Sequence, residues 1–211
     1  MLKVGLTGGF ATGKSFVGRA LADLGCYLIE ADKLGHEVML PGAEAYARIV
    51  QEFGRDILDS GGQINRRKLG AFVFADPERL AKLNSIVHPP VQRREEARMA
   101  EIARTDPQAI AVVEAAILVE TGRYKSFDRL IVVTCTREQQ MERALERGGE
   151  RQGERGTYTR EEILARLARQ LPLEEKLKVA DYVIDTSGEK EATLEQVRKV
   201  YRGLRSLAGG V

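Results

Sequence analysis

Apolar residues occur along this chain in two patterns, short continuous runs and segments of helical spacing. The alternation of these two kinds of segment predicts the architecture. Short apolar runs typical of buried parallel strands occupy residues 2–7, 26–30, 110–115 and 129–135, with a shorter run at 181–185. Most of the intervals between them carry apolar residues at helical spacing. This alternation predicts an α/β fold in which helices cover both faces of a parallel sheet.

The last helix is expected over residues 190–206, because the apolar positions there form one stripe. The stripe consists of Leu194, Val197, Val200, Tyr201 and Leu204. We therefore expect this helix to pack on the sheet.

The interval between the second and third strands is far longer than a crossover connection needs, and it reads as helical throughout. Pro41-Gly42 predicts a turn at its start, and Asp76-Pro77 predicts the start of a long helix. Pro89-Pro90 are expected to interrupt or kink that helix. The interval therefore predicts an inserted helical region.

Residues 142–156 repeat Glu-Arg four times, and the glycines within them disfavour a stable helix through the second half. Those glycines are Gly148, Gly149, Gly153 and Gly156. We expect a mobile, arginine-rich flap here, with helical periodicity returning at Ile163.

Composition excludes some partners. The 211 residues suffice for one domain with insertions, and 33 Lys and Arg against 31 Asp and Glu leave a net charge of only +2. A protein that coats DNA concentrates a basic excess on one face, whereas this balance favours a small anionic ligand. The flap alternates Glu with Arg and lacks aromatic residues, so we expect no nucleic-acid partner.

Two cysteines, Cys26 and Cys135, adjoin apolar runs and are predicted to be reduced core residues without a zinc site. The chain enters a strand at once and contains no run of about 18 apolar residues, the length that a membrane span needs. We expect a cytoplasmic protein without a membrane partner.

The strongest motif is Gly8–Ser15, which fits the phosphate-binding pattern G-x-x-x-x-G-K-[ST] between a predicted strand and a predicted helix. Its glycines let backbone N–H groups approach phosphate oxygens at a helix N-terminus. Lys14 is expected to reach the β- and γ-phosphates of a nucleotide, and the Ser15 hydroxyl to ligate Mg²⁺. The alternative, an ordinary glycine turn, is disfavoured by the strand and helix around it.

The expected nucleotide contacts, which the family resemblance described below makes contacts of ATP, are Gly8, Gly9, Ala11, Thr12, Gly13, Lys14, Ser15 and Phe16. Phe16 stands where many such loops carry a second hydroxyl that touches the α-phosphate, so this contact must come from the backbone here or be absent.

Taken together, motifs along nearly the whole chain resemble the dephospho-CoA kinase family. They are Leu6-Thr7-Gly8-Gly9 with Gly13-Lys14-Ser15, Glu30-Ala31-Asp32, His36, Pro41-Gly42, Ile64-Asn65-Arg66, Val73-Phe74, Ile86-Val87-His88-Pro89, Leu118-Val119-Glu120, Gln140, Arg143, Arg147, Gln170, Lys176, Ala180-Asp181 and Val183-Ile184-Asp185. Departures are Glu30 for the usual Asp, Ala116 for a frequent Pro, and a longer, more glycine-rich lid.

The resemblance implies a P-loop three-layer sandwich with a five-stranded parallel sheet, a helical substrate domain and a lid. On this reading, residues 1–35, 105–145 and 178–211 form the nucleotide-binding core. Residues 36–104 form the domain that binds dephospho-CoA, and residues 146–177 form the lid region. The implied reaction is ATP- and Mg²⁺-dependent phosphorylation of the ribose 3′-hydroxyl of dephospho-CoA, the last step of coenzyme A biosynthesis. We expect a monomer or a weak homo-oligomer.

The implied catalytic residues begin with Asp32, expected to accept the proton of the attacking hydroxyl or to orient it. The alternative is that Asp32 caps a helix starting near Lys33. Arg143 and Arg147 are expected to stabilise the migrating phosphoryl group, although Arg143 could instead pair with Glu142 or Glu146 on its own helix. Arg151 and Arg155 are the alternative candidates for this role if the lid of this chain is displaced along the sequence relative to the family.

The implied contacts of the acceptor are His36, Arg66, His88 and Glu120. His88 could be a histidine satisfied within the fold, Arg66 could be a solvated surface charge, and Glu120 has no chemical role that follows from its position. Glu114, near the end of the third strand, is expected to hold a magnesium-bound water, or else to be solvated.

Two rival functions remain open. One is a kinase for another small metabolite, such as a nucleoside, a nucleotide or a shikimate-like acid, which the long helical insertion disfavours. The other is a nucleotide-dependent switch that binds a protein partner, and against it the chain contains no Asn-Lys-x-Asp motif for reading guanine.

Overall fold

A computed structural model describes residues 1–74, 76–150, 159–168 and 170–209. The chain divides into two compact units. The first consists of residues 1–29 and 102–211 and carries the sheet, and the second consists of residues 30–101 and is helical.

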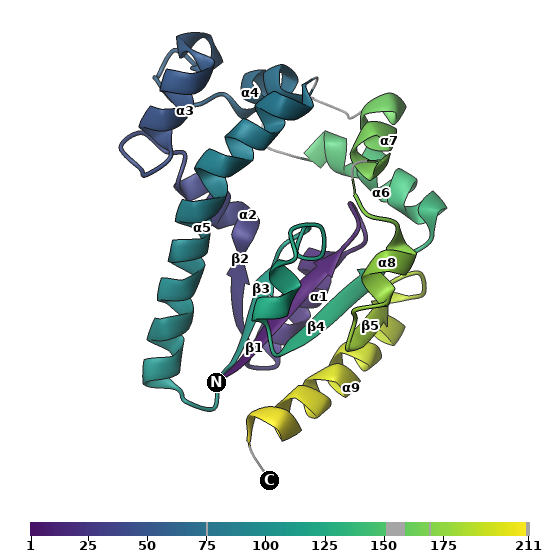
Figure 1. Ribbon diagram of the computed structural model, residues 1–211. Helices are drawn as coiled ribbons and strands as arrows, with labels where there is room; N and C mark the ends of the chain where they lie inside the picture. Colours follow the sequence, from purple (N-terminus) through teal and green to yellow (C-terminus); the bar gives the residue numbers. More distant parts are fainter. Residues whose placement is uncertain (75, 151–158, 169, 210–211) are drawn as a thin grey trace. The chain divides into compact units, whose positions relative to one another are not determined.

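The first unit is built on a five-stranded sheet with the strand order β2-β3-β1-β4-β5. Its strands are β1 Leu2–Gly8, β2 Tyr27–Glu30, β3 Ile110–Glu114, β4 Arg129–Thr134 and β5 Tyr182–Asp185. β1 pairs in parallel with both β3 and β4, and β4 pairs in parallel with β5. All five predicted strands are confirmed, and Figure 1 shows β1 at the centre of the sheet.

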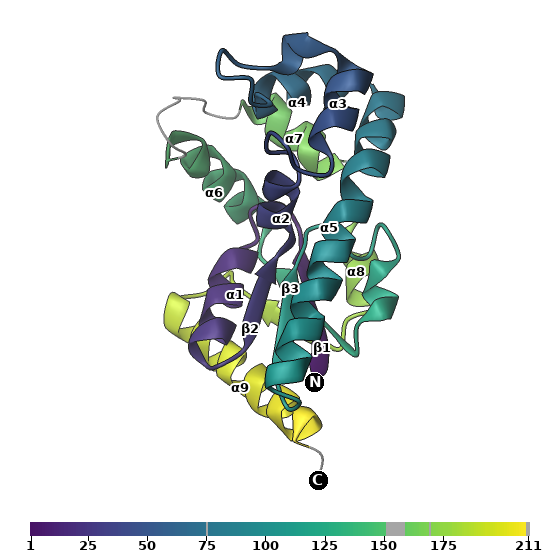
Figure 2. The same ribbon diagram turned by 90° about the vertical axis from the view of Figure 1, so that its left-hand side faces the viewer.

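Helices α1 Lys14–Asp23 and α9 Lys190–Ala208 pack against each other and cover one face of this sheet (Figures 1 and 2). From α9, Val197, Val200 and Leu204 are buried in the main hydrophobic cluster, and Leu194 and Tyr201 pack against it. The predicted stripe of the last helix is therefore confirmed.

The opposite face is covered partly by the segment that follows β3. A Cβ on Gly5 of β1 would lie 3.0 Å from side-chain atoms of Leu118 and Leu130 and 3.2 Å from Phe127. Helix η2 Arg123–Ser126 lies within this segment, and α8 Leu173–Leu177 contacts β4. This close packing explains why a central strand carries a glycine.

The strand register brings the first residues of the phosphate loop to one edge of the sheet. Leu6 pairs with Glu114 on one side, and Gly8 pairs with Val133 on the other. Because carboxyl ends of parallel strands meet at the same edge, the chain segments that follow β1, β3, β4 and β5 gather there.

Helices α6 Arg137–Glu150 and α7 Arg160–Ala168 belong to the same unit. α6 continues through Gly148 and Gly149, so the expected loss of helix at these two glycines is wrong. Two glycines cost about 1 kcal/mol each relative to alanine, which the rest of a helix of 14 residues outweighs. The remainder of the predicted flap, residues 151–158, lies outside the described residues.

The second unit is helical, as predicted. Its elements are α2 Ala31–Glu37, α3 Tyr46–Phe53, η1 Arg55–Ile57, α4 Arg66–Phe74 and most of α5 Pro77–Thr105. α3 and α4 lie near the N-terminal end of α5 (Figure 1). α5 runs without a break through Pro89 and Pro90, so the predicted interruption does not occur, although the prolines remove two helical N–H donors.

Within this unit an ion-pair network joins α5 to the region of α2. The Arg94 guanidinium lies 3.2 Å from Glu37 Oε2 and 2.6 Å from Glu44 Oε2, and Arg98 lies 3.4 Å from Glu37 Oε2. The hydrogen bond from Arg94 holds the pKa of the Glu44 carboxyl below its usual value. Exposed pairs of this kind contribute little stability individually, and here they link α5 to Glu37 at the end of α2 and to Glu44.

Both cysteines are free and buried, which confirms them as core residues. Across the described residues, no helix is both long enough and apolar enough to cross a membrane.

Candidate active site

The phosphate loop connects β1 to α1 and begins where the backbone is most crowded. A Cβ on Gly8 would collide with the carbonyl oxygen of Val133 in β4, and Gly8 has a φ of 155°. Ala11, at the middle of the loop, has a φ of 58° although it is not a glycine, and it is buried. A non-glycine residue in this left-handed region is strained, so its surroundings must hold it there.

Lys14 reaches back over the loop. Its Nζ donates to the carbonyl oxygens of Gly8, at 3.2 Å, and Gly9, at 2.9 Å. Thr12 Oγ1 donates to Gly9 O at 3.0 Å. The ammonium group therefore lies against the first residues of a loop that leads into the N-terminus of α1, where anions are stabilised.

Ser15 and Glu114 form the part of the site that suits a metal ion. Ser15 Oγ donates to Glu114 Oε1 at 2.8 Å, and Glu114 is buried at the end of β3. A hydroxyl and a carboxylate are hard oxygen donors of the kind that Mg²⁺ prefers. Among the described residues, no group of three or more His, Cys, Asp or Glu could hold a metal by itself. These two side chains fit an ion whose other ligands come from phosphate and water.

Arg143 on α6 is bound to the chain that follows β5. Its guanidinium donates to Thr186 Oγ1 at 2.8 Å and to Thr186 O at 2.7 Å. Thr186 Oγ1 in turn lies 2.8 Å from Thr12 O and 3.1 Å from Thr134 O. The alternative pairing of Arg143 within α6 is therefore wrong, because the buried Thr186 offers it two acceptors.

Two glutamines bind the backbone of Phe10 in the phosphate loop. Phe10 N donates to Gln170 Oε1 at 2.7 Å, and Gln140 Nε2 donates to Phe10 O at 3.0 Å. Ala11 packs on Ala144 of α6 and Ile163 of α7 in a small apolar cluster. The loop is thus attached to both helices.

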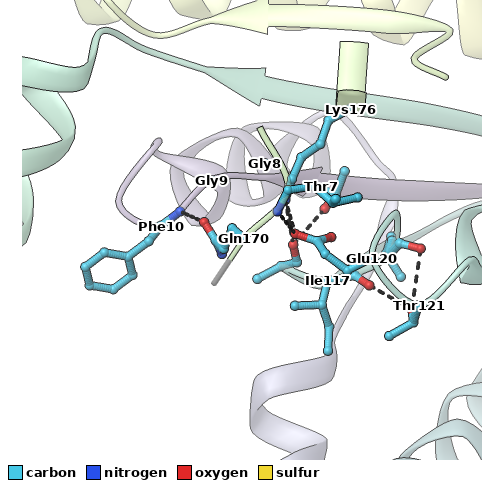
Figure 3. A network of polar contacts seen from close by, with 12 residues as sticks. Thr7, Gly8, Gly9, Phe10, Ile117, Glu120, Thr121, Gln170 and Lys176 are labelled. Carbon is cyan, nitrogen blue, oxygen red and sulfur yellow. Dashed lines mark hydrogen bonds and ion pairs between the residues drawn. The ribbon is translucent and has the colours of Figure 1, made fainter. Parts of the chain in front are cut away.

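Glu120, expected as an acceptor contact, forms a buried ion pair. Lys176 Nζ lies 2.6 Å from Glu120 Oε1, and the Lys176 side chain is only 1% exposed (Figure 3). Lys176 Nζ also lies 3.3 Å from Ala116 O, and Leu171 N donates to Glu120 Oε1 at 3.3 Å. These contacts give Glu120 a partner that the sequence did not reveal.

Asp32 and His36 lie on α2, and both side chains are exposed. α2 begins at Ala31 with Glu30 as the N-cap residue, and no side chain caps it. The helix-cap alternative for Asp32 is therefore wrong, because Asp32 already lies inside the first turn, where its charge is favourable.

Arg66 and His88 lie on other helices of the same unit. Arg66 is exposed at the first position of α4, whose N-terminus is held by Asn65 Oδ1 accepting from the Arg67 and Lys68 amides. His88 lies within α5 and is partly buried. Their expected acceptor contacts stay predictions.

Arg147 lies in α6, but its side chain is outside the described part of the structure, and so are Arg151 and Arg155. Their expected roles at the phosphoryl group also stay predictions.

Sequence reasoning gave no role to Thr186, Gln140, Gln170 or Lys176. Thr186 directly follows the last strand, so the rule that drew attention to Asp32 after the second strand could have found it. Gln140, Gln170 and Lys176 are among the residues that carry the family resemblance, but their local sequence indicates no role, because amides and lysines are common on exposed helices.

The family described as dephospho-CoA kinase has a sequence profile that matches residues 2–192 of this chain. The dephospho-CoA kinase of Aquifex aeolicus is 41% identical over 204 residues, which are 97% of this chain and 98% of that protein. Among solved structures, a Thermus thermophilus protein is 31% identical, with a TM-score of 0.77 and 96% of each chain covered. A dephospho-CoA kinase from Campylobacter jejuni shares the fold at 24% identity, with a TM-score of 0.62 and 96% of each chain covered.

Proposed function

This chain belongs to the dephospho-CoA kinase family, and we propose that it transfers the γ-phosphoryl group of ATP to the ribose 3′-hydroxyl of dephospho-CoA. The products are CoA and ADP, and the reaction is the last step of coenzyme A biosynthesis. The observation that carries the proposal is the phosphate loop, with the Lys14 ammonium held on the Gly8 and Gly9 carbonyls and the Ser15–Glu114 pair at the start of α1. Phosphoryl transfer depends mainly on positioning and charge stabilisation, which such a loop provides.

On the nucleotide side, the N–H groups of residues 11–16 surround the β-phosphate and α-phosphate. Lys14 exchanges its contacts with the Gly8 and Gly9 carbonyls for phosphate oxygens, which carry full negative charge and bind an ammonium more strongly. Phe16 contributes its amide alone, since its side chain has no hydroxyl.

Ser15 and Glu114 would hold Mg²⁺, Ser15 directly and Glu114 through a bound water. The ion supplies charge neutralisation for the β- and γ-phosphates. Glu114 supports this assignment because its carboxylate is buried and already lies 2.8 Å from the Ser15 hydroxyl.

On the acceptor side, Asp32 accepts the proton of the 3′-hydroxyl or orients that hydroxyl. Asp32 is supported by its exposure and by its position two residues beyond the carboxyl end of β2. We assign dephospho-CoA to residues 36–104, with His36, Arg66 and His88 as contacts for its charged and hydrogen-bonding groups.

Arg147 is assigned to the transferred phosphoryl group, with charge stabilisation as its role. Arg143 lies four residues earlier on the same helix, and its guanidinium is held by Thr186. We therefore assign Arg143 to holding the loop rather than to following the phosphoryl group. The two free, buried cysteines support a cytoplasmic location.

The proposal is tested by measuring ADP release with Mg²⁺ and ATP, with and without dephospho-CoA, and with adenosine, AMP and shikimate as competing acceptors. We expect dephospho-CoA alone to stimulate release, and phosphorus NMR of the product to show a 3′-phosphomonoester. Stimulation by another acceptor only would assign a different metabolite kinase. Nucleotide-dependent binding of a protein with no acceptor effect would indicate a switch.

Asp32→Asn tests the acceptor side, with Asp23→Asn as the matched control at an exposed position of α1. We expect kcat to fall by about 10²–10⁴-fold in Asp32→Asn, the usual contribution of a general base, and to stay unchanged in the control. Full activity in Asp32→Asn would remove Asp32 from the reaction.

A further inference from the structure

Phe10, the third residue of the phosphate-loop motif, has both of its backbone polar groups bound by side chains. Its N–H donates to Gln170 Oε1, and its carbonyl oxygen accepts from Gln140 Nε2. Gln140 lies on α6, and Gln170 lies beyond the end of α7. Figure 3 shows the Gln170 amide directed at the Phe10 nitrogen.

The orientation of each amide is fixed by the backbone group that it meets. A backbone N–H can only donate, so it must face the oxygen of Gln170, and a carbonyl can only accept, so it must face the nitrogen of Gln140. The two glutamines therefore have opposite roles at one residue. This difference can be tested, because Glu keeps the acceptor of Gln but not its donor.

The residues on either side of Phe10 also contact α6 and α7. A Cβ on Gly9 would lie 2.5 Å from Gln140 Nε2, so the glycine leaves room for that amide. Ala11, with its left-handed backbone, is buried against Ala144 and Ile163, and the Phe10 side chain packs on the same cluster. The strained part of the loop is thus in contact with residues of both α6 and α7.

Gln170 is itself fixed by a buried ion pair. Its neighbour Leu171 donates its N–H to Glu120 Oε1 at 3.3 Å, and Lys176 neutralises that carboxylate at 2.6 Å. Lys176 and Thr7 both donate to Ala116 O, at 3.3 and 3.2 Å. Together these contacts link Thr7, just before the loop, to Leu171, the residue that follows Gln170 (Figure 3).

We propose that Gln140 and Gln170 are positioning residues that hold the phosphate loop at Phe10 in its nucleotide-binding conformation, and that the Lys176–Glu120 pair keeps Gln170 in reach. The inference rests on the proposed function in one respect, since it takes the loop to bind the phosphates of ATP. A loop fixed before binding aligns its N–H groups without losing binding energy to ordering. The two glutamines therefore affect the affinity for ATP and not the affinity for the acceptor.

The test compares Gln170→Glu, Gln140→Glu, Gln170→Leu and Gln140→Leu by equilibrium ATP binding without acceptor. Both Glu variants add one carboxylate beside Phe10, so the difference between them reports the direction of the hydrogen bond. We expect Gln140→Glu and both Leu variants to bind ATP roughly tenfold more weakly than wild type, the effect of losing one hydrogen bond. Gln170→Glu keeps the acceptor and should bind at least threefold more tightly than Gln140→Glu.

Steady-state kinetics give the second readout. The Leu variants should raise KM for ATP while leaving KM for dephospho-CoA unchanged, and thermal unfolding should show that each variant is folded. Equal ATP affinity in the two Glu variants would overturn the inference, and so would ATP affinity equal to wild type in the Leu variants. Equal increases in both KM values would indicate a general structural defect and would also overturn it.

The ion pair is tested by Lys176→Met, Glu120→Gln and the double variant. Lys176→Met leaves a carboxylate buried without its cation and should weaken ATP binding, whereas the double variant removes the charge and should bind more tightly than Lys176→Met. No recovery in the double variant would overturn the role of the pair. Failure of wild type to use dephospho-CoA would end the proposed function only, because ATP binding still decides the inference. Failure to bind ATP at all would overturn both.

Discussion

Ser15 and Glu114 lie 99 positions apart in the chain, yet the serine hydroxyl donates to the glutamate carboxylate at 2.8 Å. Parallel pairing of β1 with β3 brings them together, because Leu6 is opposite Glu114 and the loop then turns back over the edge of the sheet. Both residues were expected to serve one metal ion, and the structure places their oxygens side by side.

The first prediction concerns magnesium. Glu114→Gln keeps an acceptor for Ser15 but removes the charge, so the Mg²⁺ concentration for half-maximal ADP release should rise by about 10- to 100-fold, as for other outer-shell ligands. A titration of activity against Mg²⁺ measures this. Glu138→Gln, at an exposed position of α6, is the control. An unchanged magnesium titration would show that Glu114 serves only to hold Ser15.

Gly9→Ala tests the crowding at the phosphate loop. The added methyl group would meet Gln140 Nε2 at 2.5 Å, so the amide must move away from Phe10. ATP binding should weaken by about tenfold, the equivalent of one lost hydrogen bond. Gly35→Ala is the matched control, since nothing lies within 4 Å of its Cβ. If both variants bind ATP like wild type, Gln140 does not depend on the space above Gly9.

Thr186 should be more important to stability than its position after an edge strand suggests. Thr186→Val removes the hydroxyl that Arg143, Thr12 and Thr134 share. Arg143 keeps its bond to Thr186 O and Thr134 O keeps the one from Thr186 N, but the Thr12 carbonyl loses the bond from the hydroxyl. We expect a loss of about 1–3 kcal/mol in the free energy of unfolding, measured by urea denaturation, and a smaller loss for Thr186→Ser. A larger loss in Thr186→Ser than in Thr186→Val would assign the effect to the methyl group instead.

The cysteine thiols should be unreactive in the folded protein. Burial raises the pKa of Cys26 to about 12, which the charge of Arg205 lowers only in part, and burial also raises the pKa of Cys135. The thiolate is the reactive form, so a thiol reagent at pH 8 should modify neither residue until denaturant is added. Rapid labelling of Cys26 without denaturant would show that the α1–α9 side of the core opens readily.

The same shift in Cys26 predicts a pH dependence of stability. The folded state favours the neutral thiol, so this contribution is fully present below the ordinary pKa of 9.0 and is lost as the pH rises toward 12. Cys26→Ala should remove this part of the alkaline loss. The readout is the unfolding midpoint in urea between pH 8 and pH 11. An identical decline in wild type and variant would show that another group dominates.

Predictions from the local sequence were wrong at two helix ends, for physical reasons. Two glycines were expected to end α6 early, but their propensity cost is small beside the packing of a long helix. Asp32 was weighed as a helix cap because it is a good capping residue, and the helix began one residue before it. Boundaries of this kind depend on neighbouring residues that a local pattern does not include.

By itself the sequence determined the five strands, the α/β class, the phosphate loop and the family, because these follow from residue spacing and from motifs contiguous in the chain. Only the tertiary structure decided the pairs Arg143–Thr186, Gln170–Phe10 and Lys176–Glu120. The first two pairs join residues that are 43 and 160 positions apart in the chain. The third joins residues 120 and 176, which are 56 positions apart. Contacts at such separations are fixed by strand order and helix packing, which no local spacing of residue types encodes.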